Sequence, residues 1–414
     1  MSASSGGKRF YGWRIVWAGC ALQAMVSAFM HQGFGAYVAV LSEVFGWSKT
    51  ALAGGAAIQQ LESALLGPLQ GWFVDRFGAR NLVRIGMVVF GVGLILFSLV
   101  DSLPMFYAAF VVIALGSSLA GYFSLTVVLV HWFEKKRAQA LSMLNFGFAA
   151  GGVMVPLLAW SLVTFGWRET AFATGIISIL VGLPLANIVR NHPRDMGERV
   201  DGERAPPADA KQGAAHDHAP AGFTVKQALR TRAFWFIALG HAFALLVVAA
   251  VNVHAITHMK EGLGYSVAQG AFIIGVITVS QVGGIAIGWW VGDRYEKRLI
   301  AASCMAGHMI GMLILTYAVS MPMLVAFAVV HGCAWGLRGS FMHAIRADYF
   351  GTRAIGMIMG FSSIIVVLGG VGGPVFAGLM ADINGNYRVG FTVLALLSGL
   401  GTAFFVFAKK PKLP

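Results

Sequence analysis

The chain has 414 residues, of which 57% are hydrophobic and 11% are charged, and its mean hydropathy is +0.74. A water-soluble core cannot bury this share of apolar surface, so the composition excludes an ordinary soluble protein. The net charge of +13 would suit a nucleic-acid-binding protein, but the distribution of the basic residues, described below, excludes that class.

Twelve apolar segments follow one another along the chain, and each is long enough to cross ~30 Å of hydrocarbon as a helix. The helices are expected at 13–40, 50–74, 81–100, 104–133, 138–165, 169–190, 232–258, 266–292, 299–319, 322–347, 354–381 and 387–408. Because the bilayer core offers no water to backbone groups, spanning segments must be helical. We therefore expect an all-α integral membrane protein, in which 13–40 is the first membrane helix and not a cleaved signal.

The basic residues divide unevenly between the two sides of this map. On one side lie only Lys49, Arg168, Lys260 and Arg388, and Arg338 falls inside a segment. The remaining lysines and arginines lie on the side that both termini share. The positive-inside rule predicts that this side is cytoplasmic, with the protein in a bacterial inner membrane and its charge facing lipid headgroups, and no nucleic-acid partner.

A polar stretch at 191–231, rich in Ala, Pro, Gly and charge, predicts a cytoplasmic linker between an N-terminal six-helix bundle (1–190) and a C-terminal one (232–414). His216 and His218 in this linker form too loose a pair to predict a metal site. Cys20, Cys304 and Cys333 fall inside predicted helices without metal-binding spacing, so no disulfide, metal or cofactor is expected.

The two halves repeat one another weakly. GWFVDRFGAR at 71–80 joins two predicted helices of the first half, and GWWVGDRYEKR at 288–298 joins the equivalent pair in the second. Internal duplication of this kind is common in membrane proteins built from two bundles.

The pattern Gly-x-x-x-Asp-Arg-x-Gly-x-Arg at 71–80 resembles the hallmark loop of the major facilitator superfamily. The segments FGWSKTAL (45–52), WFEKKRAQALSMLNFGFAAGG (132–152), FGWRETAF (165–172) and PRDMGERVDG (193–202) resemble bacterial monocarboxylate porters and oxalate/formate antiporters. The resemblance covers most of the chain. It implies a monomeric twelve-helix carrier that moves a small organic acid by alternating access, with a proton or by exchange.

The resemblance also implies a gating role for the duplicated loop. The gating residues it predicts are Asp75, Arg76, Arg80, Asp293 and Arg294. Loop carboxylates of this kind can accept hydrogen bonds from helix N-terminal amides.

One acid and one base fall near the middle of predicted helices, where charge is costly and indicates function. Arg338 is predicted to anchor a carboxylate, with room left by Gly336 and Gly339; the alternative is a fixed ion pair with Glu62 or a bond to backbone carbonyls. Glu62 is predicted to carry a coupling proton, and the alternative is a neutral carboxyl bonded to a neighbouring helix.

Other polar side chains on the predicted inner helices are candidate substrate contacts, although each can equally serve helix packing. They are His31, Tyr122, Asn145, His254, Ser280, Gln281 and His331. No phosphate-binding loop and no catalytic constellation occurs, so we expect no ATP-driven pump and no enzyme. The alternative function is efflux of amphiphilic cations, with Glu62 as the cation anchor and Arg338 as a structural residue.

Overall fold

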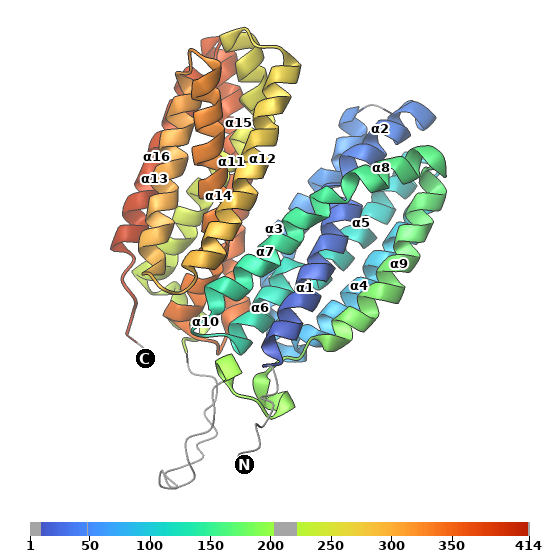
Figure 1. Cartoon of the computed structure of the whole chain (residues 1–414), viewed down its shortest axis with the longest axis vertical. Helices are drawn as coiled ribbons and strands as arrows, with labels where there is room; N and C mark the ends of the chain where they lie inside the picture. The colour runs from blue at the N-terminus through green and yellow to red at the C-terminus, as the bar shows by residue number, and fades with distance from the viewer. Residues whose placement is uncertain (1–9, 48, 203–221, 413–414) are drawn as a thin grey trace, which may run out of the picture.

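The computed structural model describes residues 10–47, 49–202 and 222–412, and this part of the chain is built from helices (Figure 1). The first half contains α1 (Gly12–Val26), the π-helical turn η1 (Ser27–His31), α2 (Phe34–Phe45), α3 (Lys49–Phe77), α4 (Ala79–Ser98), α5 (Leu103–Ala120), α6 (Tyr122–Trp132), α7 (Arg137–Val153), α8 (Val155–Thr164) and α9 (Trp167–Ile188).

The linker contains η2 (Pro193–Met196), η3 (Val200–Gly202) and α10 (Val225–Leu229). The second half contains α11 (Arg232–Leu263), α12 (Val267–Val291), α13 (Lys297–Thr316), α14 (Met321–Phe350), α15 (Ile355–Asn384) and α16 (Arg388–Phe407). Capping residues in the sequence determine where several of these helices begin. Ser266 and Gln269, for example, form a reciprocal capping box that begins α12.

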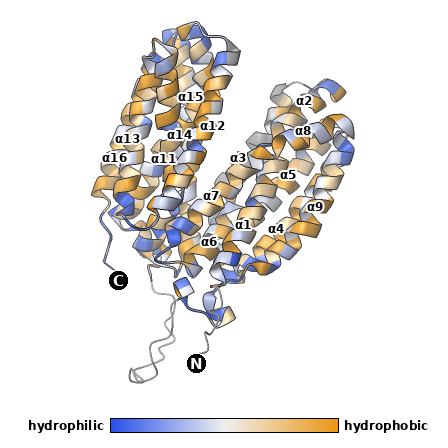
Figure 2. Cartoon of the chain, in the orientation of Figure 1, coloured by the Kyte–Doolittle hydropathy of each residue, from blue (hydrophilic) through white to orange (hydrophobic). Residues whose placement is uncertain are grey.

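These elements make twelve membrane helices, as predicted. Three of the twelve are broken: α1, η1 and α2 form one, α5 and α6 meet at Gly121, and α7 and α8 meet at Met154, two residues before Pro156. In the described residues, eleven helices are long and apolar enough to cross a membrane, and α3 is the twelfth by its place between them. Figure 2 shows hydrophobic residues along the helices and hydrophilic ones mostly at their ends.

The helices form two bundles, α1–α9 and α11–α16, which approach each other at the end that carries both termini and separate toward the opposite end (Figure 1). We call the first of these ends the terminal side. The predicted linker begins with η2 and η3 and ends at α10, and Phe223 donates its backbone N–H to the carbonyl of Phe350 at 2.8 Å. His216 and His218 lie outside the described residues.

The hydrophobic cores of the two halves differ. The N-terminal half has one continuous cluster of buried apolar side chains, whereas the C-terminal half has two. On α13 one cluster reaches Met305 and the other begins at Met312; on α14 one ends at Ala328 and the other begins at Met342. A buried polar layer lies between the two clusters.

Helices α3 and α15, from different halves, cross through glycines. A Cβ on Gly71 would lie 2.3 Å from the carbonyl oxygen of Gly356, and one on Gly360 would lie 2.4 Å from that of Gly67. Residues with side chains would hold the two backbones apart. The close contact of the halves on the terminal side therefore depends on these glycines.

We predict that Gly71→Ala opens the terminal side. The added methyl must displace the backbone of α15, and overpacking of this kind typically costs about 1–3 kcal/mol. Distances between spin labels on the terminal ends of α3 and α15 should lengthen. Gly283→Ala in α12 is the matched control, because a Cβ there meets nothing within 4 Å. Equal distance distributions in Gly71→Ala and wild type would contradict the prediction.

Candidate functional site

Five polar side chains meet between the two halves, where α6, α7 and α14 come together. The amide nitrogen of Asn145 lies 2.9 Å from the hydroxyl of Tyr122 and 3.0 Å from that of Ser340, and Ser142 donates to Ser340 at 3.0 Å. The ring of His343 packs edge-on against Tyr122, with centroids 5.1 Å apart. We call Tyr122, Asn145, Ser340 and His343 the seam cluster. It unites Tyr122 and Asn145, both predicted from the sequence, with two residues that were not.

The buried polar layer of the C-terminal half contains Arg338, His308 and His331. Arg338 is only 2% exposed, and both histidines are fully buried. The Nε and one terminal nitrogen of Arg338 have no hydrogen-bond partner. Added Cβ atoms on Gly307 and Gly311 would lie 3.1 Å from Ala334 and His331, so this face of α14 packs on α13.

Arg338 follows His331 by seven residues and therefore shares that face. The guanidinium thus lies inside the C-terminal bundle, behind the seam cluster. Helix α3, which carries Glu62, packs instead on α5 and α15, as the contacts of Gly55 and Gly67 show. Glu62 is half-buried in this position.

The expectation that Gly336 and Gly339 leave room for a ligand is wrong. A Cβ on Gly336 would lie 1.9 Å from the carbonyl oxygen of Gln281, so α12 already fills that space. At Gly339 the nearest atoms belong to Asn145, at 3.6 Å. Both glycines permit helix contact.

Arg346 is a buried cation that the sequence analysis counted among the basic residues on the side of the termini. It lies inside α14, which continues to Phe350, and it is 3% exposed. Its guanidinium donates to Ser362 of α15 at 2.7 and 3.0 Å and lies 3.2 Å from Nδ1 of His241 on α11. Arg346 follows Arg338 by eight residues, about two helical turns. This spacing was the feature of the sequence that could have indicated Arg346 as a second buried cation.

The other predicted contacts are dispersed. His31 is exposed at the end of η1, with its ring 5.5 Å from that of Phe148. Both ring nitrogens of His254 have partners, the carbonyl of Pro374 at 3.0 Å and the hydroxyl of Tyr387 at 3.2 Å. This arrangement ties α11 to α15.

Ser280 and Gln281 lie on the face of α12 that packs against α14. The side chain of Ser280 lies beside Gly332, and the backbone of Gln281 lies beside Gly336. Both side chains are half-buried. No hydrogen bond of the described residues joins either side chain to the seam cluster.

The two copies of the duplicated loop cap helices of the opposite half. Asp75 accepts hydrogen bonds from the amides of Gly356 and Met357, in the first turn of α15, at 3.2 and 3.1 Å. Asp293 accepts from the amide of Ala138, in the first turn of α7, at 2.8 Å. Each carboxylate meets free amides and the positive end of a helix dipole, so each half holds the other.

Two of the arginines of these loops lie against tryptophans. Arg76 stands over Trp72 and Arg294 over Trp290, both at 5.7 Å, so the two copies share this geometry as well. Arg80 lies in the first turn of α4, and its amide donates to the side-chain oxygen of Asn191 at 2.9 Å. Of the predicted gating residues, the aspartates therefore bridge the halves and the arginines do not.

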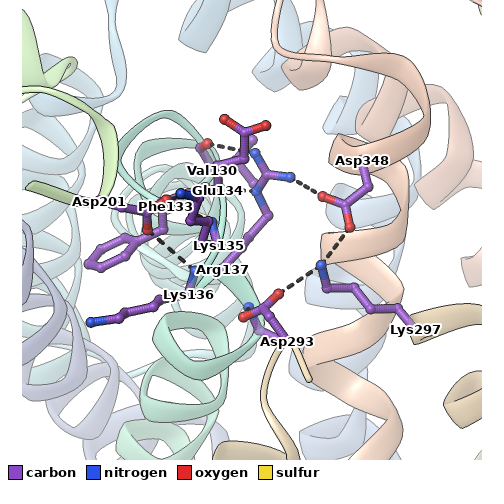
Figure 3. A network of polar contacts seen from close by, with 11 residues as sticks. Val130, Phe133, Glu134, Lys135, Lys136, Arg137, Asp201, Asp293, Lys297 and Asp348 are labelled. Atoms are coloured by element: carbon purple, nitrogen blue, oxygen red, sulfur yellow. Dashed lines mark hydrogen bonds and ion pairs between the residues drawn. The ribbon is translucent and has the colours of Figure 1, made fainter. Parts of the chain in front are cut away.

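A charge network closes the terminal side (Figure 3). Arg137 of α7 forms an ion pair with Asp348 of α14, and Lys297 lies 2.6 Å from Asp348 and 2.7 Å from Asp293. Burial raises the pKa of the Asp293 carboxyl, and the Lys297 ammonium opposes that rise. We call Arg137, Asp293, Lys297 and Asp348 the terminal latch. A cleft of about 840 Å³ borders the latch, so water weakens its ion pairs.

The segment after α9 stabilises the turn that precedes Arg137 of the terminal latch. Asp201 accepts hydrogen bonds from the amides of Glu134 and Lys135 at 3.0 and 2.7 Å, in the turn that precedes Arg137. Figure 3 shows Asp201 beside this turn. The start of the linker thereby fixes the position from which Arg137 reaches Asp348.

Comparison with known proteins identifies the family. The model of the Major Facilitator Superfamily matches residues 20–337 and 237–414, which together span most of the chain. The chain belongs to the major facilitator superfamily. Members of this family are membrane carriers, so the protein is an integral multi-pass carrier and not an enzyme.

The relatives of this major facilitator differ in what their names say they carry. Monocarboxylate transporter 13 of Bos taurus is 23% identical over 423 residues, covering 98% of this chain and 92% of its own. A probable hexose phosphate transport protein of Chlamydia trachomatis is also 23% identical, over 55% of this chain and 53% of its own. The fold matches that of the E. coli transporter FucP in its outward conformation, with a TM-score of 0.72, 15% identity and coverage of 96% and 99%.

Proposed function

We propose that this protein is a secondary active transporter that carries a small organic anion, of the monocarboxylate type, across a bacterial inner membrane. Transport proceeds by alternating access of the two bundles and is coupled to a proton or to exchange. The observation that carries the proposal is the positive interior of the C-terminal half.

That interior holds two buried arginines without acidic residues beside them. Helices α11 to α16 carry acids only near their ends, at Glu261, Asp348 and Asp382. Arg338 and Arg346 therefore place positive charge in a low-dielectric environment, where it attracts an anion strongly. A cationic substrate would be repelled there, which weighs against efflux of amphiphilic cations.

The proposed binding position is the seam cluster. Tyr122 and Ser340, which accept hydrogen bonds from Asn145, carry hydroxyl groups that can donate to a carboxylate, and His343 has a buried Nδ1 without a hydrogen-bond partner. An anion there would touch both halves, as alternating access requires. Arg338 and Arg346, inside the C-terminal bundle, attract the anion by their positive charge.

The proposed orientation places the terminal side in the cytoplasm, according to the positive-inside rule. The described conformation is then closed to the cytoplasm by the terminal latch, and it faces outward. Inward opening requires the latch and the reciprocal caps of Asp75 and Asp293 to break.

The names of the relatives support an anionic substrate. A monocarboxylate and a hexose phosphate are both organic anions, although the two classes differ in size and charge. The headgroup recognised is thus a carboxylate or a phosphate, and the seam donors favour the smaller carboxylate. Glu62 stays in the proposal as a candidate carrier of the coupling proton.

The test is a thermal-shift panel of the purified protein with monocarboxylates, dicarboxylates, sugar phosphates, neutral sugars and lipophilic cations. A ligand at 100 times its Kd stabilises the folded state by about 2.7 kcal/mol. We expect stabilisation by monocarboxylates, followed by saturable uptake of the same acids into proteoliposomes. Stabilisation by lipophilic cations alone would overturn the proposal and assign the protein to cation efflux.

A further inference from the structure

The polar layer of the C-terminal half contains two histidines in direct contact. Nδ1 of His308 on α13 lies 3.2 Å from Nδ1 of His331 on α14. Both side chains are fully buried, and Nε2 of each has no hydrogen-bond partner. The pair separates the two apolar clusters of this half.

The geometry of the contact sets how many protons the pair can hold. A bond between two Nδ1 atoms needs one ring with a proton on Nδ1 and one ring with a bare Nδ1, whose own proton is on Nε2. The donor ring then has a bare Nε2. One further proton can bind there without disturbing the contact, whereas a second would have to enter the bond itself.

A purely structural pair would be an expensive choice at this position. A buried polar atom without a partner costs about 1–3 kcal/mol, and apolar side chains would join the two clusters without that loss. His254 shows the ordinary arrangement in the same half, because both of its ring nitrogens have partners, the carbonyl of Pro374 at 3.0 Å and the hydroxyl of Tyr387 at 3.2 Å. The unpartnered nitrogens of the pair therefore point to a ligand, and a bare imidazole nitrogen binds a proton.

Few charged or titratable groups surround the pair. Cys304 lies one turn before His308 on α13, Arg338 lies two turns after His331 on α14, and His241 approaches Arg338 from α11. Helices α12 and α16 carry no ionisable residue between their end residues. Arg338 is thus the nearest fixed charge, and its influence extends to both rings.

We propose that His308 and His331 together bind one proton that moves with the substrate, and that Arg338 links the proton to the anion. An anion held at the seam cluster offsets the charge of Arg338, so a positive charge on the pair becomes more favourable. By linkage, the proton then favours the anion equally. The inference rests on the proposed function and makes the protein a symporter of an anion with a proton.

The first test uses proteoliposomes and the monocarboxylate that stabilises the protein most. One-to-one symport accumulates the anion about tenfold for a gradient of one pH unit, since both correspond to 1.4 kcal/mol. We expect His331→Gln and His308→Gln to retain exchange at equal pH and to lose this accumulation. Accumulation as in wild type, with the same proton entry measured by an internal pH dye, would overturn the inference.

Two comparison variants separate the pair from other groups. His258→Gln, a buried histidine outside the pair, is expected to accumulate the anion like wild type. If Glu62→Gln loses accumulation while both pair variants keep it, the proton belongs to Glu62 and the inference fails. If wild type neither binds nor exchanges any carboxylate, the proposed function itself has failed.

A second measurement needs no variant. Between pH 5.5 and 8, the affinity of the wild-type protein for the anion should tighten as pH falls, by up to about tenfold per unit where binding takes up one proton. This dependence should be absent in His331→Gln. An affinity that is independent of pH in wild type would overturn the inference even if the variants did not fold.

Discussion

Arg338→Met is expected to weaken binding of the carboxylate without destabilising the protein. The charge of Arg338 acts on the anion across the C-terminal bundle, and its loss should cost about 1–3 kcal/mol, or about 10- to 100-fold in Kd. Removing a buried guanidinium whose Nε and one terminal nitrogen lack partners leaves nothing unpaired. The midpoint of thermal unfolding without ligand should therefore stay equal or rise, while the shift caused by ligand becomes smaller.

Arg346→Met is the comparison that separates charge from structure. Its guanidinium bonds Ser362 and the carbonyl of Met342, so its loss leaves buried partners unsatisfied. The free energy of unfolding should fall by about 2–3 kcal/mol. If Arg338→Met instead lowers stability and leaves Kd unchanged, Arg338 is structural and takes no part in binding.

Asp348→Asn is expected to shift the protein toward opening on the terminal side. Asp348 is the shared partner of Arg137 and Lys297, and neutralising it leaves these two cations close together. Because the side chain is 26% exposed, we discount the effect to about 1–2 kcal/mol, or about 5- to 30-fold in the ratio of open to closed. Spin labels on the terminal ends of α7 and α14 would report the populations.

The matched control for Asp348 is Glu296→Gln. Glu296 pairs with Arg298 within the same half, on the same face of the molecule. Its loss should leave the populations unchanged. Equal populations in Asp348→Asn and wild type would show that the glycine crossing and the aspartate caps alone hold the terminal side closed.

The membrane helices were predictable because lipid enforces a long apolar run for every span. The segment 50–74, for example, corresponds to α3 at Lys49–Phe77, and 354–381 corresponds to α15 at Ile355–Asn384. The breaks at η1 and Gly121 were not predicted. At Gly121, Gln70 of α3 donates to the carbonyl of Ser118, a contact that hydropathy does not record.

The candidate site was only partly predictable, because the periodicity of residues along one helix does not say which neighbouring helix each of its faces contacts. Tyr122 and Asn145 were named from the sequence, but Ser340, which accepts a hydrogen bond from Asn145 across the halves, has no distinguishing feature there. His308 was missed because its partner is on another helix. Asp348 was missed because an acid at a helix end resembles any surface residue until Arg137 is placed beside it.

The glycine crossing of α3 and α15 has a consequence for the way the carrier moves. Two backbones in van der Waals contact cannot approach further, so the crossing acts as a mechanical stop that defines how far the halves can close. The charges of the terminal latch act differently, since they determine how long the molecule dwells at that stop. Substitutions in the latch should change the heights of the peaks in a distance distribution, and substitutions in the glycines should move their positions.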